Sequence, residues 1–397
     1  MLHRILYYLM LFSSITYAAT STQWRSRSIY QILTDRFART DGSTTAPCDP
    51  GYEGFCGGTW AGITQKLDYI QGMGFDAIWI SPVVEQVSNP TRAYHGYCAK
   101  NIYSLNDKFG NKDDLKTLAK ALHDRDMYLM VDVVPNHMAF DGNATTTDYS
   151  TFYPFNDRSF FHNVCFITDW TNVTQIQRCW LGGEINPLPD LDTTLPEVRT
   201  EWNTWIKSLV ANYSIDGIRV DTAQNIEESF FPAFGKAAGS LRSRGGCQLL
   251  HAVAKTPFNR EAIWLSGYNT DGELYKFIKK LNAIRKMAII KATSIVTSFL
   301  TSKATVVYYD AHNVAFAKGP ESAMVLTVIN NNGAKAVNYT LQIATSGFAP
   351  LTEVVELLTC TRTTVGLLGN LTATVTAGRP MVFYPYSLLG GTSWCGL

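Results

Sequence analysis

Residues 128–134 read YLMVDVV and residues 217–221 read GIRVD. Both runs are short and mainly apolar, which is typical of strands buried on both faces of a parallel sheet. Two similar runs precede them, at 28–33 and at 75–80 (FDAIWI). Together the four runs predict the strands of one parallel sheet.

Helical patterns separate these strands. Ile63, Leu67 and Ile70 recur at helical spacing after the first strand, and residues 113–126 carry apolar residues on one face with acids in the first turn. A further helix begins at Pro196. Repeated strand–helix units with strands this apolar predict an α/β fold, either a (β/α) barrel or a doubly wound open sheet.

The charge balance excludes some partners. The 397 residues include 34 basic and 33 acidic side chains, for a net charge of +1. Such a chain lacks the basic excess expected for binding to nucleic acid or to an anionic membrane. No glycine-rich phosphate loop follows any of the four strands, so nucleotide binding is also disfavoured.

The first twenty residues have the pattern of a secretory signal. A short polar head precedes eight apolar residues from Ile5 to Phe12, and small residues stand at Ala18 and Ala19. A membrane anchor is the alternative, but eight apolar residues fall far short of the ~20 needed to span a bilayer. We therefore expect a secreted, extracellular protein without a membrane anchor.

Changes in the residue pattern along the chain predict its domain boundaries. A loop-rich stretch follows the third strand, and from about residue 305 short β-rich runs alternate with Gly and Asn turns, which is typical of an antiparallel sandwich. The expected parts are a signal peptide at 1–19, a barrel domain at 20–137 and 196–292, an insert at 138–195 and a C-terminal β-sandwich at 300–397.

Eight cysteines suit an oxidising compartment. Six of them form pairs that are close in sequence or expected to face each other: Cys48 with Cys56, Cys165 with Cys179, and Cys360 with Cys395. Cys98 and Cys247 have no obvious mate, and the sequence alone permits about 105 connectivities. Five sequons permit glycosylation, at Asn143, Asn172, Asn212, Asn338 and Asn370.

Three polar clusters lie where strands should end, which is the catalytic face of a (β/α) barrel. They are Asp132 with Asn136 and His137, Arg219 with Asp221, and Tyr94 with His95 and Tyr97. Arg219 and Asp221 are two apart on a strand, so they point to the same side. A guanidinium beside a carboxylate keeps it ionised, as a nucleophile requires. The alternative is a salt bridge that only fills the barrel interior.

Seven stretches, in this order, carry a specific resemblance: 24–40 (WRSRSIYQILTDRFART), 74–83 (GFDAIWISPV), 93–97 (AYHGY), 127–138 (MYLMVDVVPNHM), 188–194 (LPDLDTT), 213–222 (YSIDGIRVDT) and 259–271 (NREAIWLSGYNTD). On these stretches the chain resembles the secreted fungal α-amylases of glycoside hydrolase family 13. The resemblance covers nearly the whole mature chain except about residues 240–255.

The resemblance implies a TIM-type (β/α)8 barrel with an insert after the third strand and a C-terminal β-sandwich. It also implies endo-hydrolysis of α-1,4-glucan with retention of configuration by a monomeric enzyme. That reaction needs a nucleophilic carboxylate and a protonated acid about 5 Å apart. Asp221 matches the nucleophile. The family residues that orient it or grip the sugar are matched by His95, Tyr97, His137 and Arg219, and Arg260 resembles the arginine before the last barrel helix.

A structural Ca²⁺ between insert and barrel is also implied by the resemblance, through oxygen ligands that suit a hard cation. Asn136 and Asp190 match two side-chain ligands, and the backbone carbonyl of Asn225 matches another. Gln177 stands where the family has an acid, so we expect weaker binding. The alternative is that Asn136 caps a turn and Asp190 is solvated.

Two family motifs are absent from the sequence. The Gly-Glu-Val strand with the general acid and the Asn-His-Asp motif with the third carboxylate have no counterpart, because residues 231–239 run through 240–255 directly into TPFNREAIWL (256–265). The resemblance therefore predicts a truncated barrel, with strands 5–8 missing. The carboxylates that follow Asp221 are expected to be solvated charges: Glu227, Glu228, Glu261, Asp271 and Glu273.

Further departures surround the site. Gln224 and Asn225 replace the usual Lys-His pair, which hints at a fungal subgroup that remodels cell-wall α-glucan by transglycosylation. Cys98 replaces a tryptophan, and Thr256 an acid. Three hypotheses follow: an impaired α-amylase-like enzyme or its transglycosylating relative, a non-catalytic glucan-binding remnant, or a defective gene model.

Overall fold

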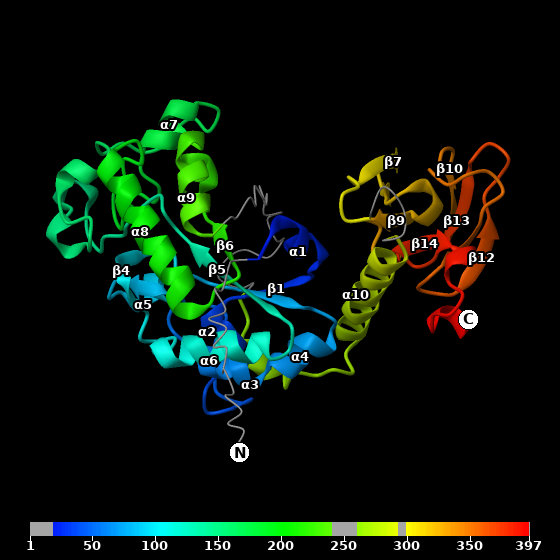
Figure 1. Ribbon diagram of the computed structural model, residues 1–397, viewed down its shortest axis with the longest axis horizontal. Helices are drawn as coiled ribbons and strands as arrows, with labels where there is room; N and C mark the ends of the chain where they lie inside the picture. The colour runs from blue at the N-terminus through cyan, green and yellow to red at the C-terminus, as the bar shows by residue number, and fades with distance from the viewer. Residues whose placement is uncertain (1–18, 240–259, 293–298, 397) are drawn as a thin grey trace, which may run out of the picture. The chain divides into compact units, whose positions relative to one another are not determined.

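The computed structural model describes residues 19–239, 260–292 and 299–396 (Figure 1). The chain divides into two compact units, one taking residues up to 71 and 75–269, the other 72–74 and 270–397. The expected signal peptide, apart from Ala19, and the unmatched segment with Cys247 lie outside the described residues.

A parallel sheet organises the first unit, and its strands are the four that the sequence predicts. They are β1 (Ile29–Ile32), β2 (Ala77–Ile80), β5 (Tyr128–Val133) and β6 (Gly217–Val220). Within the described residues the strand order is β1-β2-β5-β6, with β1 and β6 at the outer edges. All three pairings are parallel. The carboxyl ends of the strands therefore lie along one edge of the sheet.

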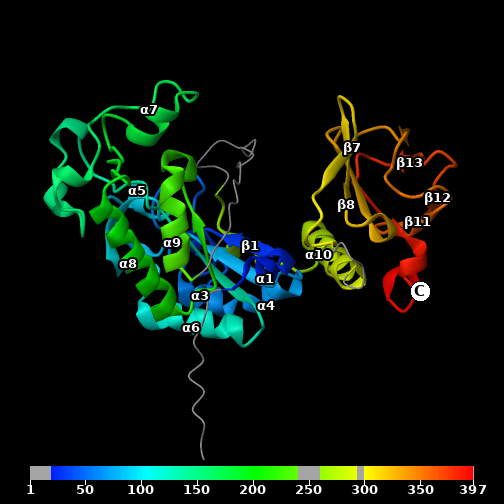
Figure 2. The same cartoon turned by 45° about the horizontal axis from the view of Figure 1, so that its top comes forward.

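The longer helices of this unit follow their apolar patterns. In α6 (Lys112–His123), Asn111 and Asp114 form a capping box, and Leu115, Leu118 and Leu122 are buried. Pro196 starts α8 (Pro196–Tyr213), which ends at Ser214 in the left-handed conformation. α9 (Phe231–Ala237) packs beside α8, as Figures 1 and 2 both show.

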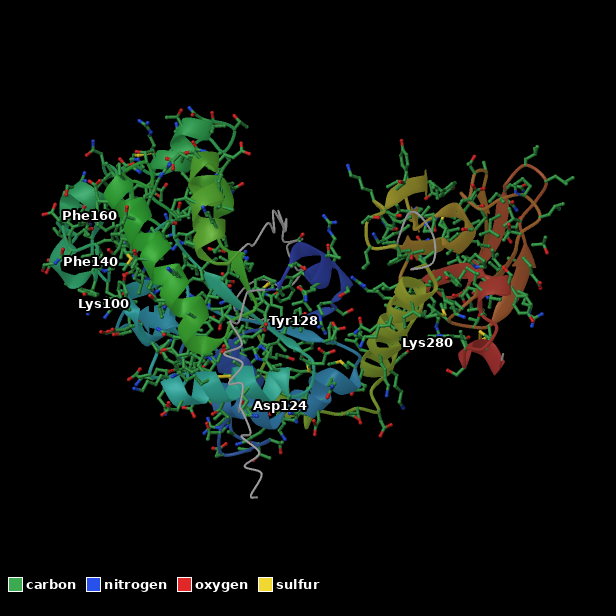
Figure 3. The ribbon with its side chains drawn as sticks, viewed as in Figure 1. Lys100, Asp124, Tyr128, Phe140, Phe160 and Lys280 are labelled. Atoms are coloured by element: carbon green, nitrogen blue, oxygen red, sulfur yellow. A yellow bond between two sulfur atoms is a disulfide. The ribbon has the colours of Figure 1, made fainter. Side chains whose placement is uncertain are left out.

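The short helices differ in part from expectation. Ile63, Leu67 and Ile70 belong to two helices, α3 (Trp60–Gln65) and α4 (Leu67–Gly72), because Lys66 leaves the helical conformation between them. Patterns too short to read from sequence form α1 (Ser21–Ser26), α2 (Thr34–Phe37) and α5 (Pro90–Ala93). Trp24 of α1 packs edge-to-face on Tyr128 at the start of β5, with ring centroids 5.3 Å apart. Figure 3 labels Tyr128.

Two strands that the sequence did not indicate lie after β2. β3 (Val84–Gln86) and β4 (Ala99–Leu105) pair antiparallel with an irregular register. The stretch 138–195 is loop-rich as predicted, with α7 (Val173–Arg178) as its α-helix and single-turn helices at η1 (Ala144–Thr146), η2 (Tyr149–Thr151) and η3 (Arg158–Phe160).

The second unit contains the predicted antiparallel strands. It begins with α10 (Glu273–Ala292), close to the helix expected from 272 to 290. A six-stranded sheet has the order β12-β11-β14-β9-β8-β7 and a two-stranded sheet pairs β10 with β13. Apolar side chains of both sheets form one core. The strands are β7 (Thr305–Tyr309), β8 (Asn313–Lys318), β9 (Val325–Asn330), β10 (Tyr339–Ile343), β11 (Glu353–Glu356), β12 (Thr361–Thr364), β13 (Leu371–Val375) and β14 (Met381–Pro385).

The three predicted disulfides are confirmed, and each lies within one unit. They join Cys48 to Cys56, Cys165 to Cys179, and Cys360 to Cys395. Cys98 is a buried free thiol, as expected. Across the described ranges, no helix combines the length and the apolar character needed to cross a bilayer.

Candidate active site

Arg219 joins two carboxylates at the carboxyl ends of β5 and β6. Asp132 on β5 and Arg219 on β6 are register partners, and Asp221 directly follows β6. Nη1 of Arg219 donates to Asp221 Oδ1 at 2.5 Å and to the two oxygens of Asp132 at 3.0 and 3.2 Å. The guanidinium thus holds the Asp221 side chain next to the sheet through a charge-assisted hydrogen bond.

Asp132 is the buried anchor of this arrangement. Its side chain has no exposed surface, and its Oδ2 also accepts from Trp79 Nε1 at 3.0 Å and from the Tyr97 hydroxyl at 2.9 Å. Burial raises the pKa of Asp132 to about 7, while Arg219 acts in the opposite direction. The carboxyl therefore organises Arg219, Trp79 and Tyr97 around itself.

Trp79 is a site residue that sequence reasoning missed. It lies on β2, and its ring also lies 5.0 Å from the Arg219 guanidinium carbon. The sequence FDAIWI shows a tryptophan near the end of a strand-type run, but only the structure shows that Trp79 is the one partly buried side chain of β2. A partly exposed indole at the end of a barrel-type strand points to the same face as the other clusters.

Two neutral histidines flank Tyr97. The Tyr97 backbone N–H donates to His95 Nδ1 at 3.1 Å, and His137 Nε2 donates to the Tyr97 carbonyl at 3.3 Å. Burial lowers the pKa of His95 to about 4, with Arg260, Arg92 and Arg36 adding to the effect. Burial also lowers the pKa of His137. Both imidazoles are therefore neutral hydrogen-bonding groups near pH 7.

The His95 pKa leads to a prediction about acid stability. The unfolded chain binds this proton near pH 6.5 and the folded protein only near pH 4, so the free energy of unfolding falls as pH drops through that window. We expect His95→Gln to remove this acid-dependent loss of unfolding free energy, which is on the order of 2 kcal/mol at pH 4.5 after allowing for solvent screening. Denaturant unfolding at pH 7, 5.5 and 4.5 measures it.

His123→Gln provides a control of opposite sign. The Asp216 carboxylate, which accepts from His123 at 2.8 Å, raises the pKa of that imidazole. Its stabilising effect is present below pH 6.5 and disappears as pH rises through the higher folded pKa. His123→Gln should therefore lose stability at low pH. A His95→Gln protein with unchanged acid sensitivity would contradict the assignment.

Arg260, near the C-terminal end of the first unit, contacts the loop that carries Tyr94, His95 and Tyr97. Its Nη1 donates to the hydroxyl of buried Tyr94 at 2.7 Å, and the Arg36 guanidinium carbon lies 4.3 Å from the Tyr94 ring. Arg260 is thus brought close to His95, as its effect on that pKa also indicates.

The residues after Asp221 separate into different roles. Thr222 has a positive φ of 50°, which turns the chain into η4 (Ala223–Asn225). Gln224 is exposed there, whereas buried Asn225 donates to the Ile176 carbonyl at 2.9 Å and so anchors α7. Glu227, expected to be a solvated charge, is half-buried and accepts a hydrogen bond from Thr193.

The suggested calcium ligands are brought together in part. Asn136 Nδ2 donates to Asp190 Oδ1 at 3.0 Å, and both side chains are buried. His162 Nδ1 lies 2.8 Å from Asp190 Oδ2. Burial raises the pKa of Asp190 to about 7. Gln177 lies on α7, next to the Ile176 carbonyl that Asn225 holds.

The oxygen atoms of these residues are suitable ligands for a hard cation, but they carry little negative charge. Carboxylate, amide and backbone oxygens are what Ca²⁺ prefers, and Asp190 is the single carboxylate among the four suggested residues. In the part of the chain that the structure describes, no three or more His, Cys, Asp and Glu side chains are grouped so as to hold a metal.

Family comparisons agree with both units. Residues 31–244 match the family model "Alpha amylase, catalytic domain" and residues 306–397 match "Alpha-amylase, domain C". These matches define the class: a catalytic domain of the α-amylase type followed by its characteristic C-terminal domain. The chain belongs to the α-amylase family.

Individual relatives match along most of their length. Alpha-amylase 2 of Schwanniomyces occidentalis is 35% identical, covering 95% of this chain and 94% of its own. The α-amylase of Saccharomycopsis fibuligera is 36% identical, with 91% and 92% covered. The solved structure of an α-amylase from Malbranchea cinnamomea superposes with a TM-score of 0.84 at 34% identity, covering 95% of this chain and 100% of that one.

The alignment with the Schwanniomyces enzyme also measures what this chain lacks. The alignment runs over 480 positions, whereas this chain has 397 residues. At least 83 alignment positions therefore have no residue in this chain. The match to the catalytic-domain model ends at residue 244, inside the segment 240–255 where the motif resemblance stops.

Proposed function

We propose that this chain carries the nucleophile half of an α-amylase active site and, as written, hydrolyses α-1,4-glucan only weakly. The observation that carries the proposal is the Arg219 guanidinium, which joins Asp221 to the buried Asp132 at the carboxyl ends of β5 and β6. A retaining glycosidase uses such an ionised carboxylate to attack the anomeric carbon and form a glycosyl-enzyme intermediate.

The surrounding residues supply orientation. In this proposal Arg219 fixes Asp221 in position, and the neutral imidazole of His95 hydrogen-bonds sugar hydroxyls. Buried His137 positions Tyr97 through the Tyr97 carbonyl. The Tyr97 ring, whose hydroxyl is tied to Asp132, packs against the sugar at the cleavage site. Arg260 supports the His95 loop through Tyr94.

The carboxylates that follow Asp221 do not supply a general acid in this proposal. Glu227 is bonded to Thr193, Asp271 pairs with Lys276 at 3.1 Å, and Glu273 is 93% exposed in the second unit. Glu228 and Glu261 are exposed. A general acid must lie within hydrogen-bond distance of the leaving oxygen. A carboxyl group at the wrong position therefore cannot act as the acid, whatever its pKa.

Asp132 has a raised pKa but the wrong position for this role. A carboxyl that titrates near 7 would suit a general acid. Its side chain is fully covered, however, and its oxygens accept hydrogen bonds from Trp79, Tyr97 and Arg219. We therefore assign Asp132 to positioning Arg219 and Tyr97.

The parallel sheet is, in this proposal, the first half of a (β/α)8 barrel whose strands 5–8 are missing. A barrel closes only when strand number and stagger match, so the outer strands β1 and β6 stay without their barrel neighbours. The domain boundaries at 20–137 with 196–292, 138–195 and 300–397 belong to the same proposal. The three disulfides support secretion into an oxidising compartment.

Restoring the missing segment tests this function. The positions of the Schwanniomyces enzyme that have no counterpart here would replace residues 240–255. We expect the restored chain to hydrolyse soluble starch, and the same chain with Asp221→Asn to be inactive. A restored, folded chain that stays inactive would overturn the proposal. Sequencing the transcript between the codons of Gly239 and Pro257 separates a true deletion from a defective gene model.

Calcium binding is a further part of the proposal. Asn136, Gln177, Asp190 and the Asn225 carbonyl would hold Ca²⁺, which would fasten the insert to the barrel. With Gln177 in place of an acid, affinity should be low, and Gln177→Glu should raise it at least about tenfold by adding a negative ligand. Titration calorimetry measures both. Tight binding that is unchanged by Asp190→Ala would exclude this site.

A further inference from the structure

The two faces of the parallel sheet in the first unit are covered to different degrees. Because alternate residues of a strand point to opposite faces, the register divides the side chains into two sets. One set packs into the main core of the unit together with the helices, and each of its members is at most 4% exposed: Ile32, Ile78, Ile80, Leu129, Val131 and Ile218. This face of the sheet is fully buried.

The opposite face, here called the inner face, is only partly covered. Its side chains include Ile29, Gln31, Trp79, Tyr128, Asp132 and Arg219. Ile29 is 38% exposed and Gln31 is exposed, while the rings of Trp79 and Tyr128 are half-buried. Apolar and aromatic surface on the second face of a sheet favours a further layer of structure against it.

Both outer strands also present main-chain groups for further pairing. The Ile32 carbonyl accepts from the Ser81 N–H at 3.1 Å, so the main chain of Ile32 faces β2. Neighbouring residues turn their main-chain groups to opposite sides of a strand, so those of Gln31 point to the outer edge of β1. Asp221 donates to β5 at 2.9 Å, so the main chain of Val220 points to the outer edge of β6. Such edges are templates for another strand.

The geometry of the sheet determines what can cover the inner face and both edges together. Among the described residues the sheet has four parallel strands, which is half of the eight whose barrel has an interior filled by side chains. A second copy supplies four more strands of the same direction. With a two-fold axis along the barrel, β6 of each copy lies beside β1 of the other, and the two junctions are identical. A single added strand would cover one edge and leave the other open.

We propose that two copies of this chain associate through the inner faces of their sheets and form one eight-stranded parallel barrel. The inference rests on the proposed function in one respect, namely that the sheet is half of a barrel. In the dimer Ile29 of each copy is buried in the shared interior, and β1 of one copy borders Asp221 of the other. The second copy therefore completes the wall of each candidate active site.

Sedimentation velocity of the purified full chain at a series of concentrations tests the association. We expect a species of twice the mass of the chain, because pairing closes after two copies. Ile29→Lys places a charge in the shared interior and should raise the dissociation constant at least about tenfold. Ile329→Lys is the matched control, because Ile329 is 42% exposed on β9 of the second unit and should leave the dimer intact.

A second variant keeps the test decisive if Ile29→Lys fails to fold. Gln31→Pro removes a main-chain N–H at the outer edge of β1, which takes no part in the pairing of β1 with β2. The folded monomer should tolerate this change, and the dissociation constant should again rise at least about tenfold. A dimer that forms equally well with Gln31→Pro would contradict pairing through this edge.

Other outcomes would overturn the dimer as a whole. They are a wild-type chain that stays monomeric, species larger than a dimer that grow with concentration, and equal effects of Ile29→Lys and Ile329→Lys. The chain with its segment restored should be a monomer, because its own strands would then occupy both edges, and a restored chain that dimerises as tightly would also contradict the inference. Starch hydrolysis by the restored chain is a separate measurement, so a failure of the proposed function is distinguishable from a failure of the dimer.

Discussion

Purified protein is expected to release reducing ends from soluble starch at least about a thousand-fold more slowly than the same chain with the segment that we propose to be missing restored. General acid catalysis typically supplies ~10²–10⁴-fold, and the glycosidic oxygen leaves poorly without a proton. In the proposed account the third carboxylate is also missing, and its loss removes further electrostatic stabilisation of the transition state. These losses are not additive, because the groups act as a unit.

An Asp221→Asn variant completes this comparison. If the unmodified chain works at the rate of the restored one and Asp221→Asn does not, a general acid is present in the chain and the proposed account of the site is wrong. If neither the unmodified chain nor Asp221→Asn releases reducing ends from starch while the restored chain does, the prediction is confirmed.

Replacing Arg219 by Leu should give the largest loss of stability among single substitutions at the site. It leaves the buried Asp132 carboxylate without its cation, and breaking a buried ion pair in this way typically costs about 3–5 kcal/mol. Denaturant unfolding of the oxidised protein at pH 7 measures the change. A loss below about 1 kcal/mol would show that Asp132 does not depend on Arg219.

The double variant Asp132→Asn with Arg219→Leu is the control. Because it removes the buried charge together with its partner, it should recover much of the stability lost by Arg219→Leu alone. If the loss of unfolding free energy in the double variant equals the sum of the losses in Asp132→Asn and Arg219→Leu, the ion pair does not couple β5 to β6.

Strands and helices with a clear apolar pattern could be predicted from the sequence. Elements whose residues show no clear apolar pattern could not. The strands at 75–80, 128–134 and 217–221 are mainly apolar, which is typical of strands buried on both faces of a parallel sheet. β3 has three residues and an irregular pairing, so its existence depends on contacts with β4. The break between α3 and α4 depends on the conformation of Lys66, which apolar spacing does not report.

The site was predictable where residues are neighbours in sequence. Arg219 and Asp221 share a strand face by spacing alone, and AYHGY places His95 beside Tyr97. The contact of Asp132 with Trp79 and Tyr97 depends on the register of β2 against β5 and on the path of a loop. Register between parallel strands is set by packing, which residue patterns do not specify, and so the central role of Asp132 emerged only from the structure.

The burial of Glu227 illustrates the same limit. A pair of consecutive glutamates outside a strand is usually solvated. Glu227 instead lies against Thr193, which is distant in sequence and buried in the stretch that also carries Asp190. The fold brings this carboxylate to the insert, and no local pattern signals that contact.

The central claim, a functional nucleophile without a general acid, is tested most directly with α-maltosyl fluoride. Fluoride leaves without protonation, so a chain that keeps Asp221 but lacks the acid should still form the glycosyl-enzyme intermediate. We expect a burst of fluoride close to one equivalent of protein, followed by slow release, and no burst with Asp221→Asn. An equal fluoride release by both proteins, or none by the wild-type chain, would contradict the account.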